Sequence, residues 1–201
     1  MRIMILGASA PLGHALTTAF LQRGDEVFGV IRRAEHAAAL QTLGAQVVPA
    51  DTSLDPRALV ASLAASFAGA GALVLAAGTG DAQAAGAARL FTAAGQQAGV
   101  KRHVMVSNWH GAAGRPDLEE HAYVQAKVAA EEDLQSRDLQ WTIVRTPRLT
   151  DAAATGLFRL QPAVADVAPP GEIGRADVAA AVVAVLADPG ETGRVLTVTA
   201  P

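Results

Sequence analysis

A tyrosine and a lysine four residues apart are the side chains of this sequence best suited to proton transfer. Tyr123 is the only tyrosine of the chain, and Lys127 is one of two lysines. They lie in residues 118–136, whose acidic start and apolar spacing predict a helix, so both side chains share one face. A nearby ammonium lowers the pKa of a phenol from about 10 and makes it a usable proton donor or acceptor. A purely structural amphipathic pair is the alternative.

Ser107 is a third candidate for the same chemistry. It follows residues 102–106, which predict a strand, and its hydroxyl is able to orient the oxygen of a substrate. A polar residue at a strand end is ordinary, so a serine without a chemical role is the alternative. His110 and His121 flank these residues and are able to donate a proton near neutral pH, although lone histidines are more often surface polar groups.

A glycine-containing turn near the N-terminus is suited to binding phosphate. The segment Gly7-Ala8-Ser9-Ala10-Pro11-Leu12-Gly13 joins an apolar run to a helical pattern. Gly7 permits a tight bend and Gly13 allows the helix to approach the sheet, while helix N–H groups face the phosphates. Ala10 stands where a middle glycine is usual; its methyl group is tolerated at a negative φ and otherwise crowds the phosphates. An ordinary βα turn is the alternative.

Two arginines end the next predicted strand. Arg32 and Arg33 occupy the place where NAD-binding proteins usually carry Asp or Glu for the ribose hydroxyls. A guanidinium pairs bidentately with a 2′-phosphate but gains nothing special from a free 2′-hydroxyl. The sequence therefore favours NADP, with NAD as the second choice. Solvated surface arginines are the alternative.

Two later segments fall at the same edge of the predicted sheet. They are Asp51-Thr52 after residues 46–48, and Ala76-Ala77-Gly78 at the end of the next strand. Ligands of such sheets bind at the carboxyl ends of the strands. We expect Asp51 to accept a hydrogen bond from the adenine amino group and Gly78 to leave room for the cofactor ribose. A turn aspartate and a turn glycine are equally good interpretations.

Short apolar runs alternate with alanine-rich segments of helical spacing along the chain. The predicted strands are residues 2–6, 26–31, 46–48, 72–76, 102–106, 141–144 and 194–198, and the predicted helices are residues 12–22, 35–42, 56–66, 82–97, 118–136 and 176–186. This alternation predicts an α/β fold, namely a Rossmann-type doubly wound parallel sheet in three αβα layers.

Residues 150–174 break this alternation. Prolines and glycines are frequent there, so we expect irregular structure or a small hairpin around residues 157–160, which shapes the substrate side. Asp177, shortly after this segment, is predicted to be a helix cap rather than a catalytic acid.

The composition limits the functions open to the chain. Its 201 residues, 51% of them hydrophobic, predict one domain over residues 1–201. A formal net charge of -3 offers no basic surface for nucleic acid or anionic lipid. The absence of cysteine excludes disulfides and thiolate metal sites, and the apolar N-terminal run is too short for a membrane span. We expect a cytoplasmic protein, monomeric or homodimeric, with a small-molecule substrate and no metal.

Together these residues resemble those of an atypical short-chain dehydrogenase/reductase, in the small NAD(P)H-binding group that is similar to NmrA-like proteins and to biliverdin and flavin reductases. The resemblance covers essentially the whole chain and is carried by residues 7–13, Arg32, Asp51, residues 76–78, Val106-Ser107, Tyr123, Lys127, residues 139–145 and residues 175–179.

The resemblance implies a role for each matching position. The turn, including Ser9, Pro11 and Leu12, binds the pyrophosphate, and Arg32 selects NADP. Ser107, Tyr123 and Lys127 perform the proton transfer linked to hydride transfer, and Lys127 also binds the cofactor ribose. Thr146 and Pro147 run beside the nicotinamide. Because Trp109 stands where extended enzymes often carry a reacting hydroxyl, Ser107 is either a catalyst or a cofactor neighbour.

Three functions follow from this resemblance. The first is an NADPH-dependent reductase of a small carbonyl, quinone or flavin-like acceptor. The second is a non-catalytic NADP-binding redox sensor or regulatory protein. The third is a nucleotide-sugar epimerase or dehydratase, which the lack of a substantial C-terminal substrate domain disfavours.

Overall fold

The computed structural model describes the chain except residues 77–81, 109–117, 165–166 and 168, and the side chains of residues 82–85 and 118–124 are also outside the description. The strands are β1 (Arg2–Leu6), β2 (Glu26–Ile31), β3 (Gln46–Pro49), β4 (Ala72–Leu75), β5 (Arg102–Asn108), β6 (Gln140–Thr146), β7 (Arg148–Thr150), β8 (Arg159–Pro162), β9 (Glu172–Gly174) and β10 (Arg194–Thr199). The helices are α1 (Pro11–Gln22), α2 (Ala37–Leu43), α3 (Pro56–Ser66), α4 (Ala82–Gln97), α5 (Leu118–Gln135) and α6 (Arg175–Ala187), with 3-10 turns at Ala34–His36 and Pro189–Glu191.

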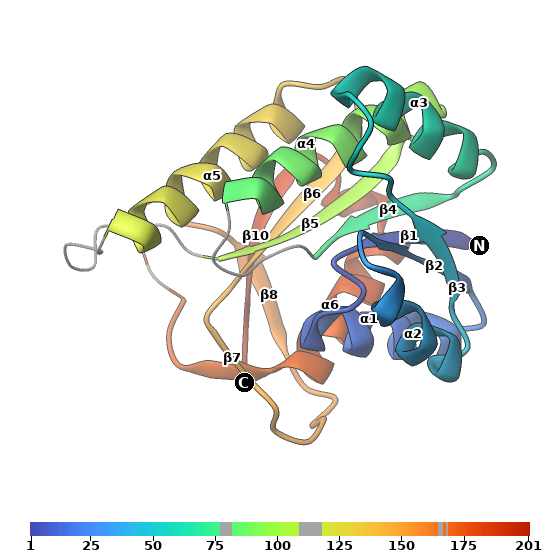
Figure 1. Cartoon of the computed structure of the whole chain (residues 1–201). Helices are drawn as coiled ribbons and strands as arrows, with labels where there is room; N and C mark the ends of the chain where they lie inside the picture. Colours follow the sequence, from blue (N-terminus) through green and yellow to red (C-terminus); the bar gives the residue numbers. More distant parts are fainter. Residues whose placement is uncertain (77–81, 109–117, 165–166, 168) are drawn as a thin grey trace.

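Eight of these strands form one main sheet in the order β3-β2-β1-β4-β5-β6-β10-β8 (Figure 1). The pairs from β3 to β10 are parallel, and only β8 pairs in the antiparallel sense, with β10. The chain goes outward from β1 to β3 and then returns to place β4 on the other side of β1. Ligands of doubly wound sheets bind at this reversal, outside the carboxyl ends of the strands.

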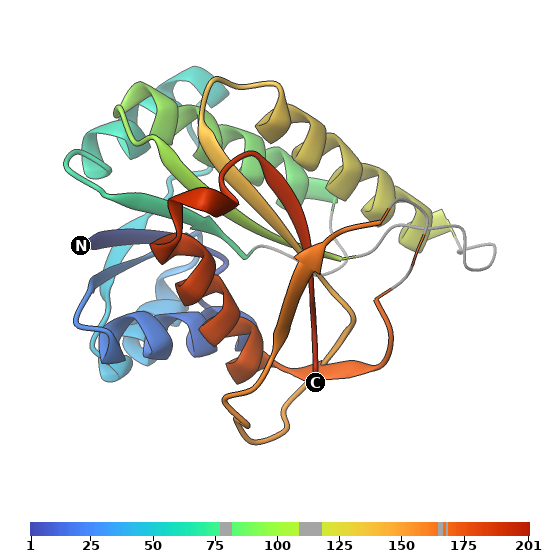
Figure 2. The ribbon, with the colours of Figure 1, turned by 180° about the vertical axis from the view of Figure 1, so that it is seen from behind.

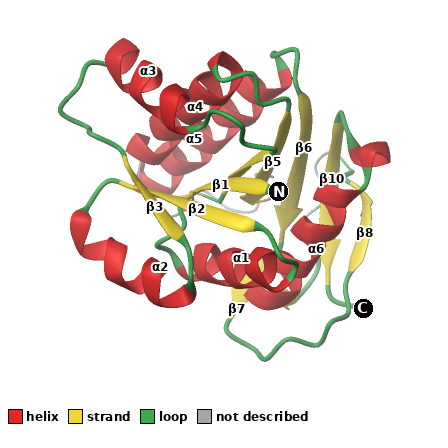
Figure 3. Ribbon diagram, turned by 90° about the vertical axis from the view of Figure 1, so that its right-hand side faces the viewer, coloured by secondary structure: helices red, strands yellow, loops and turns green. Residues whose placement is uncertain are grey.

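Helices cover both faces of the main sheet, with α1, α2 and α6 on one side and α3, α4 and α5 on the other (Figure 3). Alternate residues of β1 enter different cores: Ile3 and Ile5 pack in the core on the α1 and α6 side, and Met4 and Leu6 pack on the α3 and α4 side. Strands with two covered faces are continuously apolar. The predicted doubly wound, three-layer fold is confirmed.

Local sequence patterns place most helix ends correctly. Asp55 precedes Pro56 at the start of α3, and its carboxylate accepts hydrogen bonds from the backbone N–H groups of Arg57 (2.9 Å) and Ala58 (3.0 Å). Gly44 ends α2 in the left-handed conformation, with φ 99°. The helix expected over residues 35–42 begins instead as the 3-10 turn Ala34–His36 and continues as α2.

Of the two expectations for residues 150–174, irregular structure is found at residues 151–158, and residues 157–160 do not form a local hairpin. β8 lies at the edge of the main sheet, where it pairs with β10, and β7 pairs in parallel with β9 to form a separate two-stranded sheet. Figure 2 shows β8 beside β10, with the loop between β7 and β8 at the bottom of the view. The backbone N–H and C=O groups of β8 find their hydrogen-bond partners on β10, and not on a neighbouring strand of a local hairpin.

Asp177 is not the predicted helix cap. Gly174 is the N-cap residue of α6, and no side chain there accepts a hydrogen bond from the helix. The buried Asp177 carboxylate instead accepts hydrogen bonds from the Thr155 N–H (3.0 Å), the Thr155 hydroxyl (2.9 Å) and the Gly156 N–H (2.9 Å). It therefore ties the loop after β7 to the first turn of α6.

None of the helices in the described part of the chain combines the length and the apolar character that a membrane span requires.

Candidate functional site

The turn between β1 and α1 has the geometry of a phosphate-binding turn. Gly7 adopts φ 85°, and Ala10 adopts φ -85°, so the Ala10 methyl group is accommodated without strain. A Cβ atom at Gly13 would overlap the Gly7 carbonyl oxygen and the backbone of Ala8. No side chain caps α1 and no acidic residue lies in its first turn. The positive end of the helix is therefore available to an anion.

A cavity of about 330 Å³ lies at the carboxyl edge of the sheet, beside this turn. It is lined by Ala10, Pro11, Leu12, Ala76, Val106, Asn108, Lys127, Thr146, Arg148, Leu149 and Arg175. Lys127, Arg148 and Arg175 are cationic, and no acidic side chain is among the described residues that line it. We call it the cationic cavity. Its charge suits a ligand with anionic groups.

Lys127 is the buried cation of this cavity. Its side chain lies on α5 and is 7% exposed. Burial lowers the pKa of Lys127 from 10.5 to about 8, and the nearby Glu131 carboxylate opposes this shift. Tyr123 lies one helical turn earlier on α5, and its side chain is outside the described residues, as is that of His121; His110 is outside them altogether. The predicted Tyr123–Lys127 pair therefore stays a prediction.

Ser107 and Asn108 occupy opposite faces of β5. Successive strand residues alternate between the faces of a sheet, and Ser107 lies on the same face as Met105, in the core beside α4 and α5. Val106 and Asn108 line the cationic cavity. Ser107 is fully buried and is not among the lining residues. Sequence reasoning missed Asn108, although its position two residues after Val106 at the strand end was a usable indication.

The end of β6 also reaches the cationic cavity. Thr146 is 2% exposed and lines it, and the buried Pro147 follows. Sequence reasoning did not predict Arg148 or Arg175 as site residues. Arg148 forms a salt bridge with Glu172 (2.8 Å), across the β7–β9 pair, and Arg175 begins α6 directly after β9. The small sheet therefore brings both arginines to the cavity.

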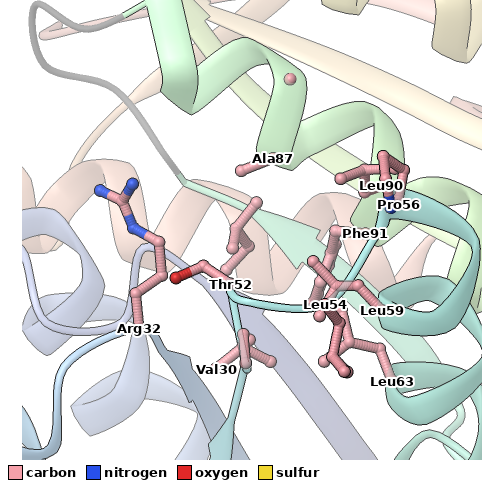
Figure 4. A pocket seen from close by; sticks show the side chains of 13 residues that line it. Val30, Arg32, Thr52, Leu54, Pro56, Leu59, Leu63, Ala87, Leu90 and Phe91 are labelled. Carbon is pink, nitrogen blue, oxygen red and sulfur yellow. The ribbon is translucent and has the colours of Figure 1, made fainter.

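A second cavity, of about 320 Å³, lies where β2 and β3 end beside α3 and α4 (Figure 4). It is lined by Leu6, Val30, Arg32, Ala50, Thr52, Leu54, Pro56, Leu59, Leu63, Gly86, Ala87, Leu90 and Phe91. Figure 4 shows Arg32 and Thr52 at one end, with Leu59, Leu63 and Phe91 at the other. We call it the apolar cavity. A flat, apolar ring with a polar or anionic substituent beside Arg32 fits this arrangement.

The two arginines after β2 differ in their surroundings. Arg33 is exposed and lies 3.7 Å from the Glu35 carboxylate. Arg32 is exposed at the edge of the apolar cavity, and among the described residues it has no hydrogen-bond or ion-pair partner. Its guanidinium is therefore available to a phosphate, whereas Arg33 is already paired.

Asp51 forms a turn of its own. Its carboxylate accepts hydrogen bonds from the N–H (3.0 Å) and hydroxyl (2.6 Å) of Ser53, which hold the pKa of Asp51 below its ordinary value. Thr52 lines the apolar cavity, whereas Asp51 is not among the lining residues. This geometry is that of the turn aspartate. Ala76 lines the cationic cavity, and Ala77 and Gly78 lie outside the described residues.

The residues present fit a dinucleotide. The apolar cavity has room for a flat ring such as adenine with Arg32 at its polar end, the start of α1 is open to a pyrophosphate, and the lining of the cationic cavity would suit the other half of a dinucleotide. The space beside Gly13, which any side chain would fill, is what allows α1 to lie close against the backbone of Gly7 and Ala8. In the described residues no group of three His, Asp or Glu side chains is placed to hold a metal ion. Fold and site together define a Rossmann-type dinucleotide-binding protein.

The chain belongs to the NAD(P)H-binding family, whose model matches residues 7–189. A candidate NAD-dependent epimerase/dehydratase from Bacillus halodurans is similar over 100% of this chain and 94% of its own, with 25% identity and a TM-score of 0.83. ChuY, an anaerobillin reductase from Escherichia coli O157:H7, is similar over 100% of this chain and 98% of its own, with 25% identity and a TM-score of 0.79.

A short-chain dehydrogenase/reductase from Veillonella parvula in complex with NADP shares the fold. It is 20% identical, with a TM-score of 0.77, and the match covers 100% of this chain and 94% of that chain. A search of curated protein sequences gave no match.

Proposed function

We propose that this protein is an NADP(H)-dependent reductase of the atypical short-chain dehydrogenase/reductase type. Its acceptor would be a small carbonyl, quinone or flavin-like compound. The observation that carries the proposal is Lys127, a buried cation at the carboxyl edge of a dinucleotide-binding sheet, one helical turn after Tyr123. The similarity to ChuY, a reductase, supports the same reaction class.

The residues proposed for the site divide into those that bind the cofactor and those that transfer a proton. The first turn of α1 binds the pyrophosphate, and Arg32 binds the 2′-phosphate. NADPH, when bound, supplies the hydride. Lys127 binds the nicotinamide ribose and, by its charge, lowers the pKa of the Tyr123 phenol. The Tyr123 phenol would donate a proton to the oxygen of a carbonyl acceptor while the bound cofactor would supply the hydride, so that the carbonyl would become an alcohol.

The remaining properties of the chain are consistent with this role. A net charge of -3 and the absence of cysteine favour a cytoplasmic enzyme with a small-molecule substrate. We infer that residues 1–201 act as one domain, as a monomer or a homodimer.

The reductase proposal is tested by NADPH oxidation. Quinones, flavins and carbonyl compounds serve as acceptors for the wild-type protein and for Tyr123→Phe. We expect the substitution to lower kcat/KM by about 100-fold, because it removes the proton donor. The Kd for NADPH should change by no more than about twofold, since the phenol oxygen contributes little to the free energy of cofactor binding.

Two outcomes would count against this reading. If the wild-type protein binds NADPH tightly but turns over none of these acceptors, it is a nucleotide-binding regulatory protein and not a reductase. If Tyr123→Phe is as active as the wild type, another group donates the proton.

The preference for NADP is tested separately at Arg32. We expect Arg32→Ala to weaken NADPH binding by about 10-fold or more while leaving NADH binding nearly unchanged, because only NADPH carries the 2′-phosphate. Isothermal titration measures both affinities. Arg33→Ala is the matched control, since Arg33 is paired with Glu35 and does not line the apolar cavity. Equal wild-type affinities for the two nucleotides would exclude the assignment to NADP.

A further inference from the structure

A buried carboxylate lies behind Lys127. Glu131 follows Lys127 by four residues on α5, and residues at this spacing are neighbours on one helix face. The Glu131 side chain is 3% exposed, and Glu131 is not among the residues that line the cationic cavity. A buried carboxylate is costly unless it is paired and hydrogen-bonded. Glu131 is therefore stabilised in the interior by its partners, and it does not face the ligand space of the cationic cavity.

Arg145 is one of these partners. It lies on β6, next to Thr146, and its Nη2 atom donates to Glu131 Oε2 at 2.7 Å. The Arg145 side chain is 23% exposed, and its Nε atom is buried without a hydrogen-bond partner among the described groups. This ion pair connects α5 to β6. It fixes the carboxylate on α5, four residues after Lys127.

The other charges around Lys127 do not favour its ammonium. Arg148 and Arg175 line the same cavity, and the first turn of α1 adds the positive end of a helix dipole. Each arginine has its own acidic partner away from Lys127. Arg148 pairs with Glu172 of β9, and Arg175 pairs with Asp151, which follows β7. Burial lowers the pKa of Lys127, and Glu131 is the group that raises it. The carboxylate therefore offsets the cost of burying the ammonium.

We propose that Glu131, held by Arg145, is a positioning residue that keeps the Lys127 ammonium charged and directed into the cationic cavity. The proposal rests on the proposed function in one respect, namely that the Lys127 charge binds the cofactor ribose and lowers the pKa of the Tyr123 phenol. Without Glu131, burial would lower the pKa of Lys127 further below its ordinary value, because the group that opposes this shift would be absent. On deprotonation the side chain would lose its charge beside Tyr123 and one of its three N–H donors to the ribose.

The charge of Lys127 is measurable without any enzyme assay. The chain has two lysines, so a protein labelled with ¹³C at lysine Cε gives two NMR signals, and exposed Lys101 serves as the internal reference. We expect the Lys127 signal of Glu131→Gln to titrate at a pH lower by about 1 or more than in the wild type. Glu131→Asp, which retains the charge, should stay closer to the wild type. Glu132→Gln is the matched control, because Glu132 is the adjacent, exposed glutamate.

The proposal is overturned if Glu131→Gln and Glu132→Gln give the same Lys127 titration. Circular dichroism establishes that each variant is folded. If Glu131→Gln does not fold, the reciprocal variant Lys127→Met provides the test. Because coupling acts equally in both directions, the ¹³C-labelled Glu131 carboxyl should titrate at a higher pH in Lys127→Met than in the wild type. An unchanged titration overturns the proposal. A protein that turns over no acceptor contradicts the reductase function but leaves these titrations as valid tests.

Discussion

Gly13→Ala should lower the free energy of unfolding by about 3 kcal/mol or more, because the added methyl group has no space. A Cβ atom at this position would overlap the Gly7 carbonyl oxygen and the Ala8 backbone. These atoms belong to the turn itself and cannot rotate away as a flexible side chain would. The helix must therefore move from the sheet. The melting temperature should fall by about 10 °C, and NADPH binding should weaken because the first N–H groups of α1 move with the turn.

Gly86→Ala is the matched control for the loss of stability, but not for NADPH binding, because Gly86 lines the apolar cavity. Gly86 is an exposed residue of α4, and no atom lies within 4 Å of the position that its Cβ would take. The same change there should raise the stability by up to about 1 kcal/mol, since alanine favours a helix over glycine. Thermal unfolding followed by circular dichroism measures both variants. A Gly13→Ala protein as stable as the wild type would mean that the turn adapts without cost.

Acid should destabilise this protein through His103, which is fully buried in β5. The ring lies beneath Gly95 of α4, with Nδ1 3.3 Å from the Lys101 carbonyl oxygen. Burial lowers the pKa of His103 from 6.5 to about 4, and the nearby charges of Arg137 and Arg102 act in the same direction.

The direction of the pH effect follows from this lowered pKa. Between pH 6.5 and 4 the unfolded chain binds a proton at His103 and the folded chain does not, so stability is lost as the pH falls through this window. The full loss is about 3 kcal/mol. It is complete near pH 4, below which both states are protonated.

His103→Leu isolates this contribution. We expect the difference in unfolding free energy between wild type and variant to shift by about 3 kcal/mol from pH 6.5 to pH 4, in favour of the variant at low pH. Urea unfolding at several pH values measures it. The carboxylates, which also titrate in acid, are common to both proteins and cancel in the difference. His36→Gln, at a half-buried position outside the sheet, is the control. A constant difference between wild type and His103→Leu would show that His103 does not control acid stability.

Most elements of this fold are predictable because their determinants are local. β1 and β2 have the predicted bounds, since each is an apolar run that ends at a glycine or a charged residue. α3 begins where Asp55 and Pro56 indicate. β8 and β9 were not predictable in this way. Their partners, β10 and β7, lie more than 20 residues away in the chain, and pairing at that distance depends on which sheet edges the rest of the fold leaves open.

The residues of the candidate site also fall into those that the sequence predicts and those that only the fold brings to the site. Four candidates were recognisable from the sequence because each has a defined place in it. Gly7, Gly13 and Arg32 follow predicted strands, and Lys127 lies four residues after Tyr123. Asn108, Arg148 and Arg175 were missed. Asn108 reaches the cationic cavity through the alternation of β5, and the two arginines reach it through the β7–β9 pair. No spacing in the chain relates these three residues to one another.

The sequence by itself determined the alternation of strands and helices, the glycine-containing turn before the first helix and the lysine four residues after the only tyrosine. Each depends on residues that are close together in the chain. Only the tertiary structure decided the electrostatic state of that lysine. Packing α5 against β6 buries Lys127 and places Glu131 against Arg145. In the poorly solvated interior these few contacts between distant segments determine whether the ammonium keeps its charge.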